Sequence, residues 1–205
     1  IDVIELSDQF KIAGLVEKKK AETLGNLGYK VIGTDEDLQA LGQRYSNALI
    51  TVGQIKTPDT RVRLFKSLNQ FNYTLPVIIS PKAYVSKHAE IGDGTIVMHG
   101  AIVNANARIG KNCIINNNAL IEHDAFIGDH CHIATRAVIN GEVSGGNETF
   151  IGSGVVTKQS ISIGSSCFIG AGVVLKNDVV SSLLIMQFLH HSAFYGFLKV
   201  EFLVF

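Results

Sequence analysis

The residue pair best suited to chemistry is His123-Asp124, within the stretch Ile121-Glu122-His123-Asp124. An imidazole can accept a proton near neutral pH because its ordinary pKa lies there, so His123 is a candidate general base. A carboxylate beside the ring can orient it and stabilise its charged form, which is the role expected of Asp124. The alternative is an ordinary surface histidine, and residue chemistry alone favours neither interpretation.

Two further histidines, His130 and His132, follow in the stretch Asp129-His130-Cys131-His132. Strand spacing would place both imidazoles on one face, so a histidine-only metal site is conceivable. No carboxylate or thiolate is clearly arranged to complete a ligand set with them. We therefore expect no metal.

From about residue 79 the sequence has a sixfold repeat. Hexads begin at every sixth position from Val85 to Leu175, and fourteen of the sixteen open with an aliphatic residue, Gly145 and Thr157 being the exceptions. The fifth position is small or β-branched, and glycine often stands second. A sixfold period fits neither an amphipathic helix nor a hairpin meander. It is typical of a solenoid in which each hexad supplies one short strand and one turn.

The repeat also predicts where candidate residues lie. Three hexads make one triangular coil, so positions that differ by 18 should stack, and the run gives roughly five coils. His123 stands third in its hexad, outside the rows that fill the interior. Gly141 stacks on it and could let a ligand approach the backbone while its N–H stabilises an oxyanion, unless it is simply a turn glycine. At 145–148 the aliphatic residue that would fill the core is missing, which predicts a local bulge or loop.

The cysteines are better explained by packing than by chemistry. Cys113, Cys131 and Cys167 all fall at the fifth hexad position, where a small buried residue is required. We expect them to fill the core rather than to act as nucleophiles. That expectation argues against a covalent acyl-cysteine intermediate.

Residues 1–78 follow a different pattern, in which helix-like and strand-like segments alternate. Strands are predicted at 11–16, 29–32, 48–52 and 75–79, and helices at 1–7, at 34–45 and from 58 onwards. In the last helix apolar residues recur at every third position, as at Val62, Phe65 and Leu68. The alternation predicts a small parallel sheet with helices packed against it.

The hexads resemble those of the bacterial transferase hexapeptide family. A small α/β region followed by hexads resembles the branch that contains sialic acid O-acetyltransferases and N-acetyltransferases of nucleotide-linked 4-amino sugars. The resemblance covers about residues 1–180. It implies a left-handed parallel β-helix over 79–180, preceded over 1–78 by a small, N-terminally incomplete α/β Rossmann-like domain without its first strand and glycine-rich turn.

The resemblance also implies a reaction. It is acetyl-CoA-dependent acetylation of the amino group of a nucleotide-linked amino sugar in bacterial surface-glycan biosynthesis, with His123 as base and Asp124 as its partner. It implies a cytoplasmic homotrimer that binds acetyl-CoA between neighbouring β-helices. Two alternatives stay open. A sialic acid O-acetyltransferase would make similar demands on the base, and a β-helix can be a non-catalytic module.

Further cofactor-binding residues follow from the same resemblance. His132 matches a histidine that contacts acetyl-CoA in the N-acetyltransferases. Gly141, Ser153 and Ala171 match positions that line the acetyl-CoA site.

Substrate binding is expected within the N-terminal region 1–78, at Glu17, Lys18 and Gly53. These residues follow predicted strands, and open parallel sheets bind ligands beyond the carboxyl ends of their strands. Lys18 departs from the paired acidic residues of the family, and plain loop residues are an equally open interpretation.

Composition limits the remaining possibilities. The chain has 18 Lys+Arg and 18 Asp+Glu residues, so no basic footprint indicates a nucleic-acid partner. Three cysteines without a pairing pattern favour a reducing compartment. Residues 181–205 form an atypical apolar tail, but His190, His191, Lys199 and Glu201 interrupt it too often for a membrane span.

Overall fold

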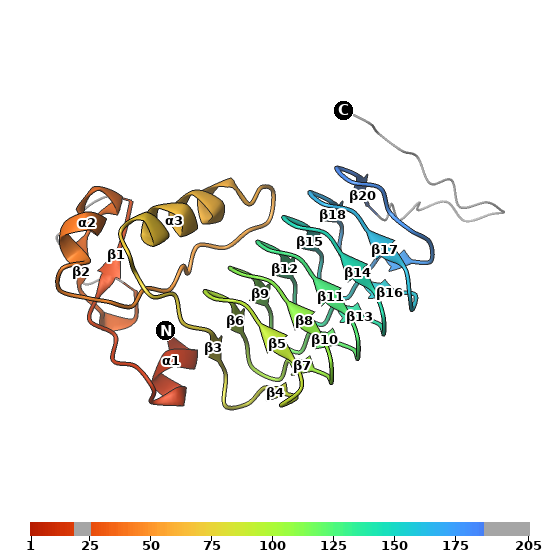
Figure 1. The fold of residues 1–205 in the computed structure, drawn as a ribbon, viewed down its shortest axis with the longest axis horizontal. Helices are drawn as coiled ribbons and strands as arrows, with labels where there is room; N and C mark the ends of the chain where they lie inside the picture. Colours follow the sequence, from red (N-terminus) through yellow and green to blue (C-terminus); the bar gives the residue numbers. More distant parts are fainter. Residues whose placement is uncertain (19–25, 187–205) are drawn as a thin grey trace, which may run out of the picture.

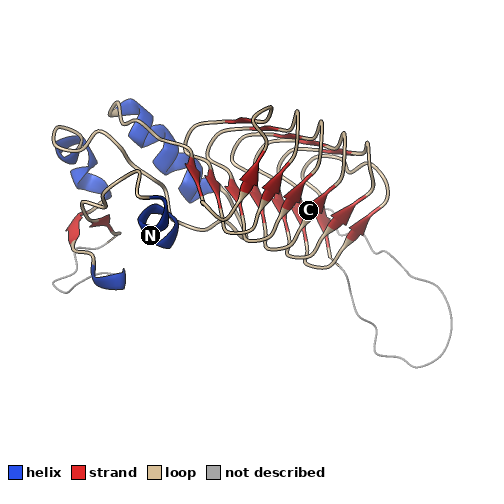
Figure 2. Cartoon of the chain, turned by 90° about the horizontal axis from the view of Figure 1, so that it is seen from below, coloured by secondary structure: helices blue, strands red, loops and turns tan. Residues whose placement is uncertain are grey.

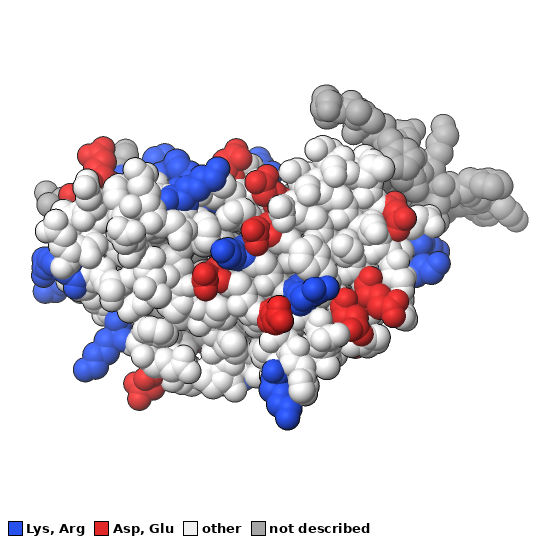
Figure 3. All heavy atoms as spheres, in the orientation of Figure 1, with Lys and Arg blue, Asp and Glu red and all other residues white. Residues whose placement is uncertain are grey.

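The computed structural model describes residues 1–18 and 26–186. Most of the chain is a solenoid of short parallel strands, and a small region with three α-helices lies at its N-terminal end (Figure 1). Acidic and basic side chains are interspersed over the face of the molecule shown in Figure 3.

The solenoid is built from two-residue strands, one for each hexad. They are β3 (Ile78–Ile79), β4 (Tyr84–Val85), β5 (Glu90–Ile91), β6 (Ile96–Val97), β7 (Ile102–Val103), β8 (Arg108–Ile109), β9 (Ile114–Ile115), β10 (Leu120–Ile121), β11 (Phe126–Ile127), β12 (His132–Ile133), β13 (Val138–Ile139), β14 (Ser144–Gly145), β15 (Phe150–Ile151), β16 (Val156–Thr157), β17 (Ser162–Ile163), β18 (Phe168–Ile169), β19 (Val174–Leu175) and β20 (Leu184–Ile185).

These strands form three sheets, which are the faces of a triangular prism. In the seven-stranded face the order is β20-β18-β15-β12-β9-β6-β3, in the six-stranded face β19-β16-β13-β10-β7-β4, and in the five-stranded face β17-β14-β11-β8-β5. Neighbouring strands are parallel and lie one coil apart, as where Leu120 pairs with Ile102 and with Val138. The fold is a left-handed parallel β-helix. The sixfold period predicts its coils, and the family resemblance predicts its left-handed sense.

The turns at the prism edges have a common conformation. The fourth residue of the hexad adopts a positive φ at most turns, for example 61° at Asp124 and 65° at Asn106. Short polar side chains tolerate this left-handed region better than bulky ones do. The left-handed conformation is therefore required at the fourth position of the hexad, and not at the second position, where glycine often stands.

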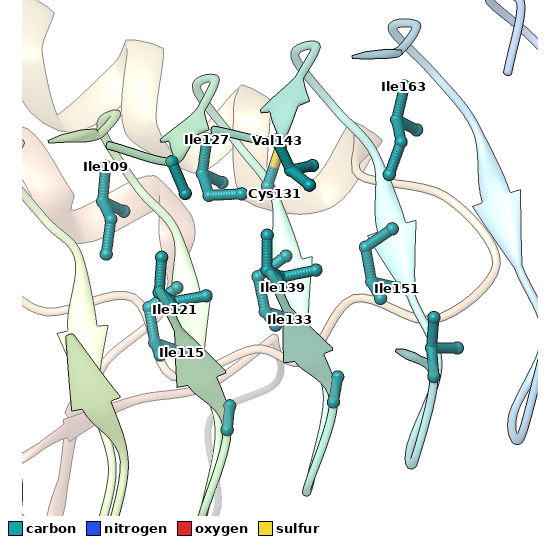
Figure 4. Packing of buried hydrophobic residues seen from close by; sticks show 14 of the residues in the cluster. Ile109, Ile115, Ile121, Ile127, Cys131, Ile133, Ile139, Val143, Ile151 and Ile163 are labelled. Carbon is teal, nitrogen blue, oxygen red and sulfur yellow. The ribbon is translucent and has the colours of Figure 1, made fainter. Parts of the chain in front are cut away.

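The interior of the prism is filled by the first and fifth residues of the hexads. Ile121, Ile133 and Ile139 are each no more than 1% exposed and point into the interior (Figure 4). Cys113, Cys131 and Cys167 are buried with them, which confirms that the cysteines lie in the core.

The predicted bulge at 145–148 is wrong. Ser144 and Gly145 pair in register with β11 on one side and with β17 on the other. The backbone ladder is unaffected by the missing side chain, since Gly128 N–H still donates to Gly145 O at 2.9 Å. The other non-aliphatic position, Thr157, is buried and accepts the Asn140 N–H at 2.9 Å through its hydroxyl.

The last coil is shorter than the others by two positions. Ile163 bridges to Val179, a step of 16 in the numbering, whereas Ile127 pairs with Gly145, a step of 18. Strand β20 then pairs with β18, so the regular fold continues past residue 180. The remainder of the predicted apolar tail, residues 187–205, lies outside the described residues.

The N-terminal region contains fewer strands than the sequence predicts. Its elements are α1 (Asp2–Ser7), β1 (Leu15–Val16), η1 (Asn26–Gly28), β2 (Val31–Gly33), η2 (Asp35–Asp37), α2 (Leu38–Leu41) and α3 (Asp59–Gln70). Within the described part of this region β1 and β2 pair in parallel, and a single parallel bridge joins Asn47 to Thr74. Residues 48–52 form no strand, because the carbonyl groups of Ile50 and Val52 accept hydrogen bonds from the Arg61 guanidinium instead, at 2.8 Å each. Within 75–79 only β3 is a strand, and it starts the seven-stranded face.

The N-terminal region lies at the end of the β-helix where its first strands are (Figure 2). Buried polar side chains attach it there. Arg61 on α3 is 1% exposed and donates to the Asn112 carbonyl and side-chain oxygens at 3.2 and 2.7 Å. Gln54 is also 1% exposed and donates to His130 O at 3.0 Å. Across residues 1–18 and 26–186, no helix combines the length and apolar character that a membrane crossing requires.

Candidate active site

His123 lies in the turn between β10 and β11, at the prism edge that joins the six- and five-stranded faces. We call this edge the His123 corner; positions 87, 105, 123, 141, 159 and 177 stack along it at intervals of 18. The His123 Nδ1 atom is 2.8 Å from Asp124 Oδ2. The side chains of both residues are about half exposed, at 52% and 45%, so a ligand can reach the imidazole.

The carboxylates around His123 favour its protonated form. The hydrogen bond to Asp124 raises the pKa of His123 above its ordinary value of 6.5, and the charges of Glu122 and Glu142 act in the same direction. Asp124 itself is held ionised, because hydrogen bonds from Asn106 and then from His123 lower its pKa. The pair can thus take up a proton at Nε2 while Asp124 stabilises the charge that forms.

Gly141 is positioned directly against the His123 ring. A Cβ atom at residue 141 would lie 2.8 Å from both Nε2 and Cε1 of His123, closer than carbon atoms of side chains approach such groups. The need for glycine here comes from this close approach and not from an unusual φ. Gly141 is buried in the single chain, and among the described residues its N–H donates no hydrogen bond.

Asn106 is a site residue that sequence reasoning missed. It lies one coil before Asp124 and donates through Nδ2 to Asp124 Oδ1 at 2.8 Å. A parallel bond joins Asn104 Nδ2 to Glu122 Oε2, also at 2.8 Å. The two residues of each pair lie one coil apart. This spacing can be counted in the sequence, so both contacts could have been predicted.

His132 lies away from the His123 corner, on strand β12 of the seven-stranded face. It is 8% exposed, its Nδ1 is 2.5 Å from Gln54 O, and its Nε2 is 3.2 Å from the Asn116 side-chain nitrogen. Burial lowers its pKa, so the ring is held neutral beneath the N-terminal region. The expectation that strand spacing places both imidazoles on one face is wrong, because His130 lies in the turn before β12 with a φ of 59°. Its ring packs against Phe65, whereas the His132 ring packs against Phe150.

Ser153 and Ala171 are exposed and stack one coil apart at a second edge, between the seven- and six-stranded faces. We call this edge the Ser153 corner. Within the described residues the backbone N–H groups of both residues donate no hydrogen bond. One protomer therefore carries His123 and Gly141 at one edge of the six-stranded face, and these two open N–H groups at the other edge.

The residues predicted to bind substrate are divided between two places. Lys18 lines a cavity of about 450 Å³ together with Thr34, Asp35, Glu36 and Arg63. This cavity lies beyond the carboxyl ends of β1 and β2, as expected for a parallel sheet. Glu17, whose N–H donates to Gly33 O at 3.1 Å, does not line it.

Gly53 is not among the residues that line this cavity either. It precedes Gln54 in the segment that covers His132, and open space surrounds its α-carbon. Within the described residues no group of three histidine, cysteine or carboxylate side chains is arranged to hold a metal.

Comparison with known proteins agrees with this geometry. The family model "Bacterial transferase hexapeptide (six repeats)" matches residues 88–123 and 106–141. PerB from Caulobacter crescentus, solved with CoA and GDP-perosamine, is 30% identical with a TM-score of 0.76, over 80% of this chain and 78% of that one. A search of curated protein sequences gives no match.

Two further solved structures cover more of the chain. A variant of perosamine N-acetyltransferase from Caulobacter crescentus, in complex with CoA and GDP-perosamine, is 27% identical with a TM-score of 0.85, over 91% of this chain and 86% of that one. The acetyltransferase domain of PglB from Neisseria gonorrhoeae, with acetyl coenzyme A, is 27% identical with a TM-score of 0.82, over 90% and 87%.

Fold and comparisons together define an acyltransferase built on a left-handed parallel β-helix. This chain belongs to the bacterial transferase hexapeptide family and groups there with the sugar acetyltransferases.

Proposed function

We propose that the chain transfers the acetyl group of acetyl-CoA to the amino group of a nucleotide-linked amino sugar, with His123 as the general base. The observation that carries the proposal is the arrangement at the His123 corner, where a base polarised by Asp124 has its ring directly against Gly141, whose N–H donates no hydrogen bond among the described residues. The donor and the substrate class are supported by the structures of PerB and perosamine N-acetyltransferase, which were solved in complex with CoA and GDP-perosamine.

The reaction needs one group that stabilises the negative charge on the carbonyl oxygen and another that accepts the proton of the attacking amine. The neutral amine attacks the thioester carbonyl, forming the C–N bond while the carbonyl oxygen becomes negative. The Gly141 N–H donates a hydrogen bond to that oxygen, and His123 Nε2 takes the proton that the amine loses. Asp124 stabilises the imidazolium. Collapse of the intermediate breaks the C–S bond, and the CoA thiolate leaves and takes up the proton.

The buried cysteines support direct transfer over a covalent acyl-enzyme. Each has its Sγ enclosed in the core, and that of Cys113 donates to Gly128 O at 3.2 Å. A thiol in this environment cannot reach a thioester at the prism edge.

The proposed active enzyme is a homotrimer. The outward row of the six-stranded face is apolar throughout, and its members are Tyr84, Ile102, Leu120, Val138, Val156 and Val174. Tyr84 and Val174 are 59% and 58% exposed in the single chain. Packing of three such faces around an axis would bury this row and bring the His123 corner of one protomer to the Ser153 corner of the next. Acetyl-CoA would then bind between the two corners.

A direct test measures thiol release from acetyl-CoA by the purified chain with UDP- and GDP-linked 4-amino sugars, and with sialic acid as the hydroxyl acceptor. The proposal predicts turnover with an amino sugar nucleotide and N-acetylation of the product by mass spectrometry. Turnover with sialic acid alone would replace it by an O-acetyltransferase.

A further inference from the structure

Three histidines of the β-helix lie in its contact with the N-terminal region. His99 bonds to α1, His132 bonds to the segment that precedes α3, and His130 packs edge-on against α3 itself. A histidine side chain changes its charge near neutral pH. The atoms that the two nitrogens of each ring face therefore decide how this contact responds to acid.

His130 faces an amide whose orientation is fixed. Its Nδ1 is 2.9 Å from Asn112 Nδ2, and Asn112 Oδ1 accepts a hydrogen bond from the Arg61 guanidinium at 2.7 Å. A guanidinium has only donors, so the amide oxygen must face Arg61 and the amide N–H must face His130. Protonation of Nδ1 would set two donors against each other. It would also add a positive charge near Arg61, which is 1% exposed and forms no ion pair among the described residues.

His132 is constrained in the same way, at both of its nitrogens. Its Nδ1 lies against Gln54 O, which can only accept, so Nδ1 carries the proton of the neutral ring. Its Nε2 is 3.2 Å from Asn116 Nδ2, and that amide is held in place because Asn116 Oδ1 accepts the Asn117 N–H at 2.7 Å. A second proton would therefore break the bond to Asn116.

The surrounding charges do not offset this preference for neutral rings. Burial is the largest influence on His130 and His132 and lowers the pKa of each below its ordinary value of 6.5. The carboxylates that act against burial at His130 are Asp129 and Glu148, and the cations that act with it are Arg61 and Lys66 of α3. At His132 the Arg61 charge adds to burial, and the hydrogen bond to Gln54 acts against it. The attachment is therefore fully stable above pH 6.5 and weakens as the pH falls below that value.

His99 differs from the other two, because its partners tolerate a second proton. Its Nε2 is 2.6 Å from Asp2 Oδ2, where an N–H is required in either charge state. Its Nδ1 is 2.6 Å from Ser80 Oγ, and a hydroxyl can donate or accept. Protonation keeps both bonds and adds an attraction to the carboxylate, so α1 should stay attached in acid.

We propose that His130 and His132 form an acid-sensitive latch, which holds residues 48–71 on the β-helix while both rings are neutral and releases them when the rings are protonated. Release separates α3 and the segment before it from the prism, and leaves the prism folded and α1 attached. The latch does not depend on the transfer reaction, since none of its bonds involves His123 or Gly141.

Hydrogen exchange of the full chain tests the latch, with the rates at about pH 7.5 and about pH 5.5 each corrected for the intrinsic rate at that pH. Protection of residues 48–71 should fall roughly tenfold or more at the lower pH, while protection of the β-helix core and of α1 stays within about twofold. In the His130→Asn/His132→Asn variant the new amides can accept from Asn112 and donate to Gln54 without titrating, so the pH dependence should disappear. His88→Asn is the matched control, because residue 88 is an exposed histidine, and it should keep the pH dependence.

A second variant tests the latch without removing either ring. Asn112→Asp replaces the donor that faces His130 by an acceptor, so protonation of His130 should now strengthen the contact and the loss of protection at low pH should become smaller. Equal protection of residues 48–71 at both pH values would overturn the latch, as would an undiminished loss in both the double variant and Asn112→Asp. A parallel loss in the β-helix core would also overturn it, because the chain would then unfold as a whole in acid.

Discussion

The imidazole of His123 lies directly against the backbone of Gly141, one coil further along the same edge of the prism. The same one-coil interval also stacks Asn106 on Asp124, with a hydrogen bond of 2.8 Å. A base, its carboxylate partner and a free N–H are thus held by three successive coils of a rigid solenoid.

Gly141→Ala should impair catalysis without unfolding the protein. The added methyl group would lie 2.8 Å from His123 Nε2 and must displace the ring or block the acetyl carbonyl. We expect kcat to fall by about 10²–10³, the effect of an oxyanion contact that can no longer form, because the methyl group keeps the carbonyl from the N–H that alanine retains. Thermal stability should change little. Gly145→Ala is the control, because a methyl group there meets only ordinary contacts at 3.5 Å. Equal activity of the two alanine variants would refute the role of Gly141.

The pH dependence of kcat/KM should report His123. The base must be unprotonated, and its hydrogen bond to Asp124 raises its pKa, so activity should increase with pH through a midpoint above 6.5. In Asp124→Asn this stabilisation of the imidazolium is lost, and the midpoint should move to lower pH while the maximal rate falls. Glu142→Gln removes a weaker influence and should shift the midpoint less. A larger shift in Glu142→Gln than in Asp124→Asn would contradict this order of causes.

Association should depend on the apolar row of the six-stranded face. The change Val138→Glu places a carboxylate in the middle of that row, where burial between subunits would leave it without a partner. We expect light scattering to show a trimer for the unmodified protein and a monomer for the variant, with loss of activity. Phe126→Glu makes a comparable change on the exposed surface of the five-stranded face and should stay trimeric. A monomer with full activity would contradict a site shared between subunits.

The attachment of the N-terminal region should depend on Arg61. Its guanidinium donates to four acceptors around the β-helix contact, and Arg61→Ala leaves buried carbonyl groups without partners. We expect a loss of on the order of 3 kcal/mol, seen as faster hydrogen exchange in α3 and residues 48–54 while the β-helix core stays protected.

Arg63→Ala provides the comparison on the same helix. The Arg63 side chain is 57% exposed and pairs with Asp35 at the surface, so its removal should cost about 1 kcal/mol at most. Similar exchange rates in the two variants would show that Arg61 does not fasten the region.

The β-helix could be predicted from the sequence because its rule is local. Within each hexad the residue types show which side chains face the interior. Backbone hydrogen bonds between coils then keep the strands in register even at Gly145, where the expected bulge does not occur. The stacking of Gly141 on His123 followed from the same count along the chain. That count could equally have revealed Asn106.

What could not be predicted depends on contacts between distant segments. Residues 48–52 have the composition of a strand, but their carbonyl groups bond to Arg61, whose burial no local pattern indicates. His132 matches the family pattern, yet its ring is covered by Gln54, which lies 78 positions earlier. The two-position contraction of the last coil also follows no periodic signal.

The most direct test of the whole account is the turnover number of His123→Ala with acetyl-CoA and an amino sugar nucleotide. We predict a kcat lower by about 10²–10⁴ at unchanged thermal stability, with CoA binding retained. His88→Ala is the control, because residue 88 is an exposed histidine in a turn of the same corner, two coils earlier. A His123→Ala enzyme that turns over as fast as His88→Ala would contradict the account.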